Sequence, residues 1–148
     1  MKYAYGLNSE INKKNILVSK KQAATISEKA KAKLNTKIFR VFKAVKDEEL
    51  QGYGILINRK VRSKNAVVLY LISIDSILKG VEIIAFNEPP EYIPSETWIK
   101  QLENIPTDKN LVVSKDIPTI TGATLSARSL VDGSRVAFAF YNEILKVK

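Results

Sequence analysis

Apolar residues gather in four short runs in the middle of the chain, and polar or turn-forming residues separate them. The runs at 38–45 and 50–58 are rich in β-branched and aromatic residues, as strands are. The run at 66–74 is the most apolar and is expected to lie centrally in a sheet, and the run at 81–86 follows it after a glycine. Four consecutive strands with short links predict a twisted antiparallel meander.

Two helices are predicted on either side of these strands. The sequence from Ser19 to Gln22 forms a capping box, so a helix is expected to begin there and to run to about Leu34, where Asn35 ends it. Its apolar stripe is weak and alanine-rich, which predicts packing on the outside of the sheet. A longer helix is predicted from about Ala123 to Leu145, because its apolar residues follow a 3.6-residue period. The members of this stripe are Ala127, Leu130, Val131, Ser134, Ala137, Phe138, Tyr141, Ile144 and Leu145.

In the remaining segments the sequence predicts loops, a short helix and the boundary between an N-terminal lead-in and the domain. Three prolines make residues 87–94 a rigid excursion from the sheet, Ser95 is expected to cap a short helix that contains Trp98, and a second loop spans 106–118. Residues 1–18 are expected to form a polar, loosely held lead-in, and 19–148 a single domain. The predicted fold class is therefore α+β: a twisted antiparallel sheet, a long C-terminal helix packed on it and a short N-terminal helix.

Composition excludes several kinds of chemistry. The 148 residues are 45% apolar and 26% charged, as in an ordinary globular protein, and they include neither histidine nor cysteine. A Ser-His-Asp triad, a thiol nucleophile, a disulfide and the usual zinc and iron–sulfur sites are thus excluded. No run of apolar residues approaches the roughly 20 that a transmembrane helix needs. The groups that remain available for binding or catalysis are hydroxyls, amides, carboxylates, cations or a bound cofactor.

Positive charge is concentrated at the start of the chain. The first 46 residues hold twelve Lys or Arg against two Glu, within a net charge of +9 for the whole chain. Such a segment can attract nucleic acid, anionic lipid or an acidic protein, but a solvated helix face explains it more simply. No aromatic residue lies between Gly6 and Ile38 to stack on bases, so nucleic acid is not expected as a partner.

The segment 116–128 carries the most informative chemistry. It is a loop that leads into the long helix, whose first amides have no partner within the helix and whose dipole favours negative charge. Gly122 and Ala123 are small enough to let an anion approach the backbone, and the neighbouring threonine and serine residues supply hydroxyls. The pattern suits a phosphate, although simple capping of the helix is an alternative. It lacks the lysine of a P-loop.

The string Thr121-Gly122-Ala123-Thr124-Leu125-Ser126 resembles the signature of the FMN-binding domain family, which includes the flavin-bearing subunits of the Rnf and sodium-pumping NADH:quinone reductase complexes. Further matches cover about two-thirds of the chain in the order that the family shows. These matches are Gly52-Tyr53-Gly54, the segment Lys79 to Ile83, Glu88-Pro89-Pro90, and Trp98 with Gln101. The resemblance implies an FMN cofactor.

The resemblance also implies roles for individual residues. The six residues Thr121, Gly122, Ala123, Thr124, Leu125 and Ser126 would surround the FMN phosphate, and a separate flavin transferase would attach FMN to Thr124 as a phosphoester. The family's usual aspartate six positions before the acceptor is replaced by Pro118, with Asp116 two residues further back, and its histidine is replaced by Asn87. Covalent and non-covalent binding therefore both stay open.

Five further residues are candidates for cofactor contact, each with an alternative. Glu88, Pro89, Tyr92 and Trp98 are expected near the flavin ring, and Arg128 near the phosphate. A lone Trp on a short helix is more often a core residue, which is the alternative for Trp98. The alternatives for the others are that Glu88 caps its loop, that Tyr92 is an exposed aromatic and that Arg128 is a solvent-facing cation.

The function that the resemblance implies is electron transfer by a bound flavin, without a side chain acting as general acid or base and without a stand-alone enzymatic activity. The implied partners are redox proteins of a membrane electron-transfer chain. The implied setting is extracytoplasmic, at the outer face of a bacterial membrane, with a signal or anchor that this sequence does not contain. A basic nucleic-acid-binding or partner-docking module without a cofactor is the alternative.

Overall fold

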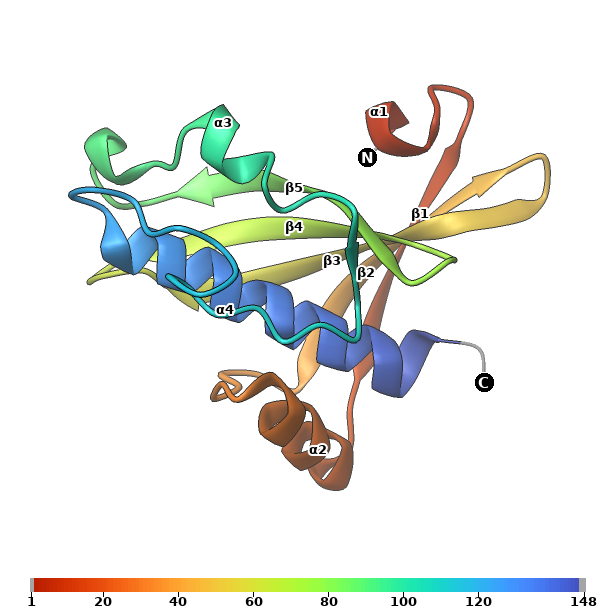
Figure 1. Cartoon of the computed structure of the whole chain (residues 1–148). Helices are drawn as coiled ribbons and strands as arrows, with labels where there is room; N and C mark the ends of the chain where they lie inside the picture. Colours follow the sequence, from red (N-terminus) through yellow and green to blue (C-terminus); the bar gives the residue numbers. More distant parts are fainter. Residues whose placement is uncertain (1, 147–148) are drawn as a thin grey trace.

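The computed structural model of the protein describes residues 2–146 and confirms the α+β class (Figure 1). Its strands form one antiparallel sheet in which each strand pairs with its neighbours in sequence, so the predicted meander is present. The strands are β1 (Glu10–Leu17), β2 (Ile38–Lys46), β3 (Glu49–Lys60), β4 (Asn65–Ser73), β5 (Ile77–Phe86) and β6 (Ile105–Pro106). The helices are α1 (Lys2–Tyr5), α2 (Lys20–Ala30), α3 (Glu96–Ile99) and α4 (Thr124–Phe140), which continues as a π-helical turn (Tyr141–Leu145).

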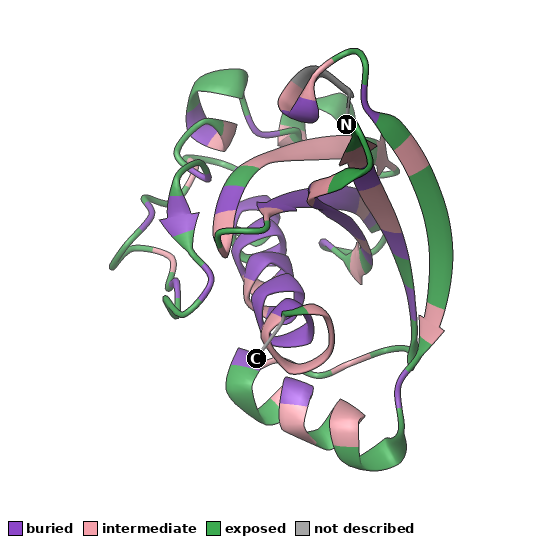
Figure 2. Cartoon of the chain, turned by 90° about the vertical axis from the view of Figure 1, so that its right-hand side faces the viewer, coloured by how far each residue is buried: buried purple, intermediate pink, exposed green. Residues whose placement is uncertain are grey.

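Helix α4 lies inside the curve of the sheet, and residues on most of its sides are buried (Figure 2). The inward faces of β2, β3 and β4 supply Val41, Ile55 and Ile72, each with no exposed surface. These side chains share one core with Leu130 and Ala137 of α4. The predicted stripe of the C-terminal helix is therefore confirmed, and the helix is the centre of the domain.

Tyr70 and Gly133 set how closely α4 approaches β4. The Tyr70 hydroxyl donates a hydrogen bond of 2.7 Å to the Leu130 carbonyl within the helix. A Cβ atom at Gly133 would lie inside the van der Waals radius of that hydroxyl and 3.0 Å from Tyr70 Cζ. A side chain at 133 is thus incompatible with this position of the tyrosine.

The lead-in expected at residues 1–18 is corrected, because residues 10–17 form an edge strand of the sheet. β1 pairs with β2 along its whole length, from Glu10 opposite Val45 to Leu17 opposite Ile38. Before it, the Tyr5 hydroxyl donates to the Tyr53 carbonyl at 2.9 Å. Backbone pairing with β2 and the buried Tyr5 side chain hold this segment in place. Its polar composition is the reason that no strand was predicted there.

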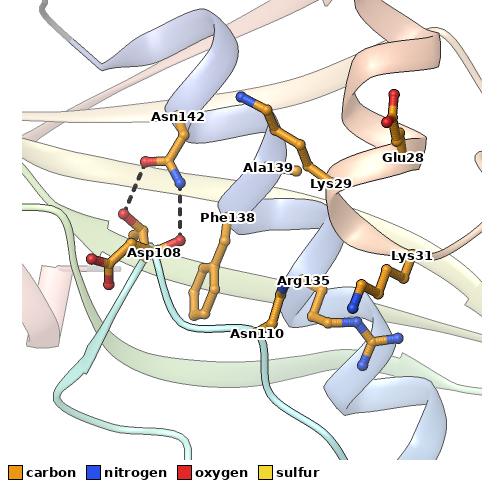
Figure 3. Close-up of a pocket in the computed structure, with 10 residues that line it drawn as sticks. Glu28, Lys29, Lys31, Asp108, Asn110, Arg135, Phe138, Ala139 and Asn142 are labelled. Carbon is orange, nitrogen blue, oxygen red and sulfur yellow. Dashed lines mark hydrogen bonds between the residues drawn. The ribbon is translucent and has the colours of Figure 1, made fainter.

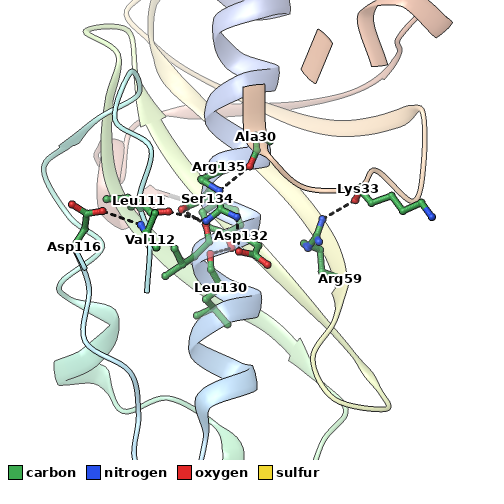
Figure 4. Close-up of polar contacts among 12 residues, drawn as sticks. Ala30, Lys33, Arg59, Leu111, Val112, Asp116, Leu130, Asp132, Ser134 and Arg135 are labelled. Carbon is green, nitrogen blue, oxygen red and sulfur yellow. Dashed lines mark hydrogen bonds and ion pairs between the residues drawn. The ribbon is translucent and has the colours of Figure 1, made fainter. Parts of the chain in front are cut away.

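Helix α2 begins as predicted but ends earlier. Ser19 and Gln22 form the expected capping box, whereas the helix stops at Ala30 and Lys31 adopts a left-handed conformation with φ 51°. Arg135 of α4 donates to the Ala30 carbonyl at 2.7 Å and also bonds Leu111 and Asp132 (Figure 4). The helix packs against α4, which corrects the expected packing on the outside of the sheet.

Within residues 2–146, no helix combines the length and the apolar character needed to cross a membrane.

Candidate functional site

A cleft of about 270 Å³ opens between the start of α4 and the turn that joins β3 to β4. Seven of the residues expected from the sequence line it, and two others, Val61 and Arg62, complete the wall. The expected residues are Glu88, Tyr92, Gly122, Ala123, Thr124, Leu125 and Ser126. The sheet topology therefore brings the helix-opening motif and the proline-rich loop to one place.

The start of α4 presents backbone amides to this cleft. Ala123 is the N-cap residue with φ −141°, and no side chain caps the helix. Gly122, just before it, has φ +77° and open space where a Cβ would lie, so glycine is needed for its backbone angle and not for its size. Uncapped first-turn amides and the positive end of the helix dipole favour an anion here.

Ser126 adds a hydroxyl to these amides. The residue is only 1% exposed, it lines the cleft, and its hydroxyl forms no hydrogen bond with any described residue. The described residues include no fully buried side-chain polar atom without a partner, so this hydroxyl keeps an open side toward the cleft, where a ligand can bond it. The exposed hydroxyl-bearing residue Thr124 lies two residues earlier on the same rim.

Glu88 is buried at the opposite side of the cleft and holds the β3–β4 turn. Its carboxylate accepts hydrogen bonds from the Ser63 amide at 3.3 Å, the Ser63 hydroxyl at 3.1 Å and the Lys64 amide at 3.2 Å. Glu88 is 6% exposed. Glu88 thus caps the β3–β4 turn and not its own loop, which differs from the alternative given for it above.

Arg62 is the charged site residue that sequence reasoning missed, together with its apolar neighbour Val61. Its Nη1 atom donates to the Tyr92 hydroxyl at 2.8 Å, and its Cζ atom lies 5.5 Å from the centre of that ring. The two residues are thirty positions apart, and neither belongs to a recognisable motif. A basic residue in a turn between two strongly apolar strands was the only available signal.

Four expected site residues do not line the cleft: Pro89, Trp98, Thr121 and Arg128. Trp98 is 6% exposed in the main core, and its Nε1 atom donates to the Pro118 carbonyl at 2.7 Å. It therefore anchors the loop that precedes the motif, as its core interpretation predicts. Arg128 lines a separate hollow together with Lys31 and Asp132.

Asp116, the possible substitute for the aspartate replaced by Pro118, is engaged in its own loop. It accepts a hydrogen bond from the Val112 amide at 2.9 Å and lies 3.9 Å from the Lys109 ammonium (Figure 4). It does not line the cleft. This arrangement gives no support to a realigned loop in which Asp116 takes over the role of the missing aspartate.

A larger cleft of about 350 Å³ lies toward the other end of α4, with Glu28, Lys29 and Lys31 on one side (Figure 3). Three of its other polar residues bond within the protein: Thr107 and Asn142 bond each other twice, at 3.0 and 2.9 Å, and Arg135 bonds three acceptors. Among the described residues, no group of three carboxylates could hold a metal ion. The cleft at the start of α4 is therefore the stronger candidate.

No protein-family model matches the chain, and no curated protein matches its sequence. A solved structure does match: the crystal structure of NqrC from Shewanella oneidensis, at 18% sequence identity and a TM-score of 0.59. The match covers 86% of this chain and 67% of that chain. The chain therefore has the fold of Shewanella oneidensis NqrC.

Proposed function

We propose that this domain binds FMN and transfers electrons, with the FMN phosphate held at the start of α4. The observation that carries the proposal is the cleft itself, which places the uncapped amides of α4 beside the Ser126 hydroxyl, a group that has no hydrogen-bond partner among the described residues and opens on the cleft. A phosphate offers several strong acceptor oxygens and negative charge, and these groups supply donors and a positive dipole. The fold match to NqrC from Shewanella oneidensis is consistent with the proposal at the level of the fold, and the motif resembles a family that includes flavin-bearing subunits.

The size of the cleft fits the phosphate end of FMN better than the whole molecule. Pockets that enclose a small ligand have volumes of roughly 300–1,000 Å³, and this cleft has about 270 Å³. The flavin ring would consequently remain at the surface, near Tyr92 and Leu125. Leu125 is 44% exposed and offers an apolar surface there. A surface position suits a carrier whose ring must approach other proteins.

The protein's own residues bind and orient, and the flavin when bound supplies the redox chemistry. The α4 amides and Ser126 fix the phosphate, and Gly122 supplies the positive φ with which the chain enters α4. None of the residues that line the cleft is assigned a proton-transfer role. The domain is thus proposed as a carrier that works between redox partner proteins and not as an enzyme on its own.

The attachment of FMN and the cellular setting are further parts of the proposal. The hydroxyl oxygen of the exposed Thr124 is the acceptor: a flavin transferase would bond it to the FMN phosphorus of FAD, breaking the pyrophosphate bond and releasing AMP. By the same resemblance, the domain works in a membrane electron-transfer complex at the outer face of a bacterial membrane.

The proposal is tested by adding FMN to the flavin-free protein and measuring flavin fluorescence and the melting temperature. Binding should quench the fluorescence and raise the melting temperature, since a ligand specific for the folded state stabilises it. Acid precipitation after co-expression with a flavin transferase then separates attached from free flavin. Thr124→Ala should abolish attachment, whereas Thr119→Ala, an exposed threonine outside the cleft, should leave it unchanged. A protein that neither binds FMN nor is stabilised by it would reject the proposed function.

A further inference from the structure

We propose that Arg62 is the side-chain cation that pairs with the phosphate in this cleft and that Tyr92 and Glu88 hold it in position. This inference rests on the proposed function. It extends the site beyond the helix-opening motif to the β3–β4 turn, which no part of the motif includes. It also makes the cleft selective for flavins that carry a phosphate.

The charges in the cleft show why a cation is needed. Glu88 and Arg62 are the charged side chains among the residues that line it. A buried carboxylate repels a phosphate unless its charge is compensated. The three hydrogen bonds from Ser63 and Lys64 satisfy the carboxylate oxygens of Glu88, and Arg62 brings the opposite charge to the same wall.

Arg62 keeps donors available for a ligand. A guanidinium has five N–H donors, and among the described residues Arg62 forms one hydrogen bond, to the Tyr92 hydroxyl at 2.8 Å, and no ion pair. The contact with the Tyr92 ring orients the guanidinium while leaving its other donors unused. Because guanidinium and phosphate match in a bidentate geometry, arginine suits this position better than lysine.

The turn that carries Arg62 is rigid, so the cation is placed in advance. The Val61 amide donates to the Lys64 carbonyl at 2.9 Å, which closes the turn. Glu88, only 6% exposed, binds the next two residues of the same turn. Placing a donor before binding reduces the entropy lost when the ligand is held. Glu88 therefore acts on the phosphate through the position of Arg62.

The test compares FMN with riboflavin, which lacks the phosphate, in equilibrium titrations of flavin-free protein. Arg62→Gln should raise the Kd for FMN by about 10- to 100-fold, as expected for loss of a charge-assisted hydrogen bond, and should change the Kd for riboflavin less than about twofold. Arg62→Lys should recover part of the FMN affinity. Tyr92→Phe, which removes the orienting hydroxyl, should raise the Kd for FMN a few-fold and leave the Kd for riboflavin unchanged. Lys64→Gln, an exposed cation of the same turn outside the cleft, should leave both unchanged.

Salt dependence supplies a second readout. Because Arg62 pairs with the phosphate, the FMN affinity of the wild-type protein should fall as salt is added. The FMN affinity of the Arg62→Gln variant should fall less steeply. Equal losses for FMN and riboflavin, or no loss in Arg62→Gln, would overturn the role of Arg62 while leaving the flavin function in place. A wild-type protein that binds neither flavin would reject both proposals together.

Discussion

Gly133 offers the sharpest test of how α4 is seated on the sheet. Replacing it with alanine would place a methyl group inside contact distance of the Tyr70 hydroxyl and 3.0 Å from Cζ of that ring. Both residues are buried, so the ring has little room to retreat. The Tyr70 hydroxyl must move away from the Leu130 carbonyl, which it now bonds at 2.7 Å.

The size of the effect follows from three opposing contributions. Alanine in place of glycine favours a helix by about 1 kcal/mol. Overpacking a filled core costs about 1–3 kcal/mol, and losing the hydrogen bond costs about 0.5–1.5 kcal/mol. We therefore expect Gly133→Ala to lower the free energy of unfolding by about 2 kcal/mol, against the direction that helix propensity alone predicts.

Urea unfolding of four proteins measures this: the wild type, Gly133→Ala, Tyr70→Phe and the double variant. Because Tyr70→Phe removes the clashing oxygen, the alanine should cost about 1–2 kcal/mol less in its presence. Gly80→Ala is the matched control, since nothing lies within 4 Å of its added Cβ. An unchanged or increased stability of Gly133→Ala, or strict additivity with Tyr70→Phe, would refute the proposed seating of the helix.

Three further predictions concern pH, a side-chain bridge and a helix cap. Burial raises the pKa of Tyr70 above its ordinary value of 10.0, so the unfolded chain loses this proton first and the free energy of unfolding falls as pH rises above about 10. The wild type should lose more stability than Tyr70→Phe between about pH 9 and 11 in urea titrations. Arg135→Met should lower the free energy of unfolding by about 2–3 kcal/mol, because the Ala30 and Leu111 carbonyls and Asp132 lose a charged donor. An unchanged urea midpoint would contradict this. Ser19→Ala should cost about 1 kcal/mol and speed amide exchange in the first turn of α2, most clearly at Gln22.

The meander was predictable because its strands are bounded by clear turn signals and are rich in residues that favour strands. β2, β3 and β4 begin and end within two residues of their predicted positions. β5 begins at Ile77, four residues earlier than expected, because Gly80 interrupts the strand pattern without interrupting the pairing. The two-residue strand β6 is too short to leave a signal, and only its pairing with Ile77 and Leu78 defines it.

β1 escaped prediction for a different reason. An edge strand needs few apolar residues, and β1 has Ile11 and Ile16 on opposite faces among mainly exposed polar side chains. The early end of α2 is also a tertiary effect, since Arg135 binds its last carbonyl from 105 positions away. Local patterns contain neither kind of information.

The candidate site also contains residues that local sequence patterns predicted and residues that they did not. The helix-opening motif was visible because its residues are contiguous, and the structure places five of the six on one cleft. Arg62 was invisible because it reaches the cleft through strand pairing. Trp98 was equally compatible with a flavin contact and a core position, and only its burial and its bond to Pro118 distinguish the two.

The position of β1 has a consequence for any shortened form of this protein. A chain that starts at Ser19 would leave β2 as the outermost strand, with free amides and carbonyls that a second copy can recruit. β2 carries Phe39, Val41 and Phe42, whereas β1 carries Lys13 and Lys14, charges that discourage such recruitment. β1 thus covers the edge of β2 and opposes self-association, and light scattering should detect aggregates when residues 1–18 are removed.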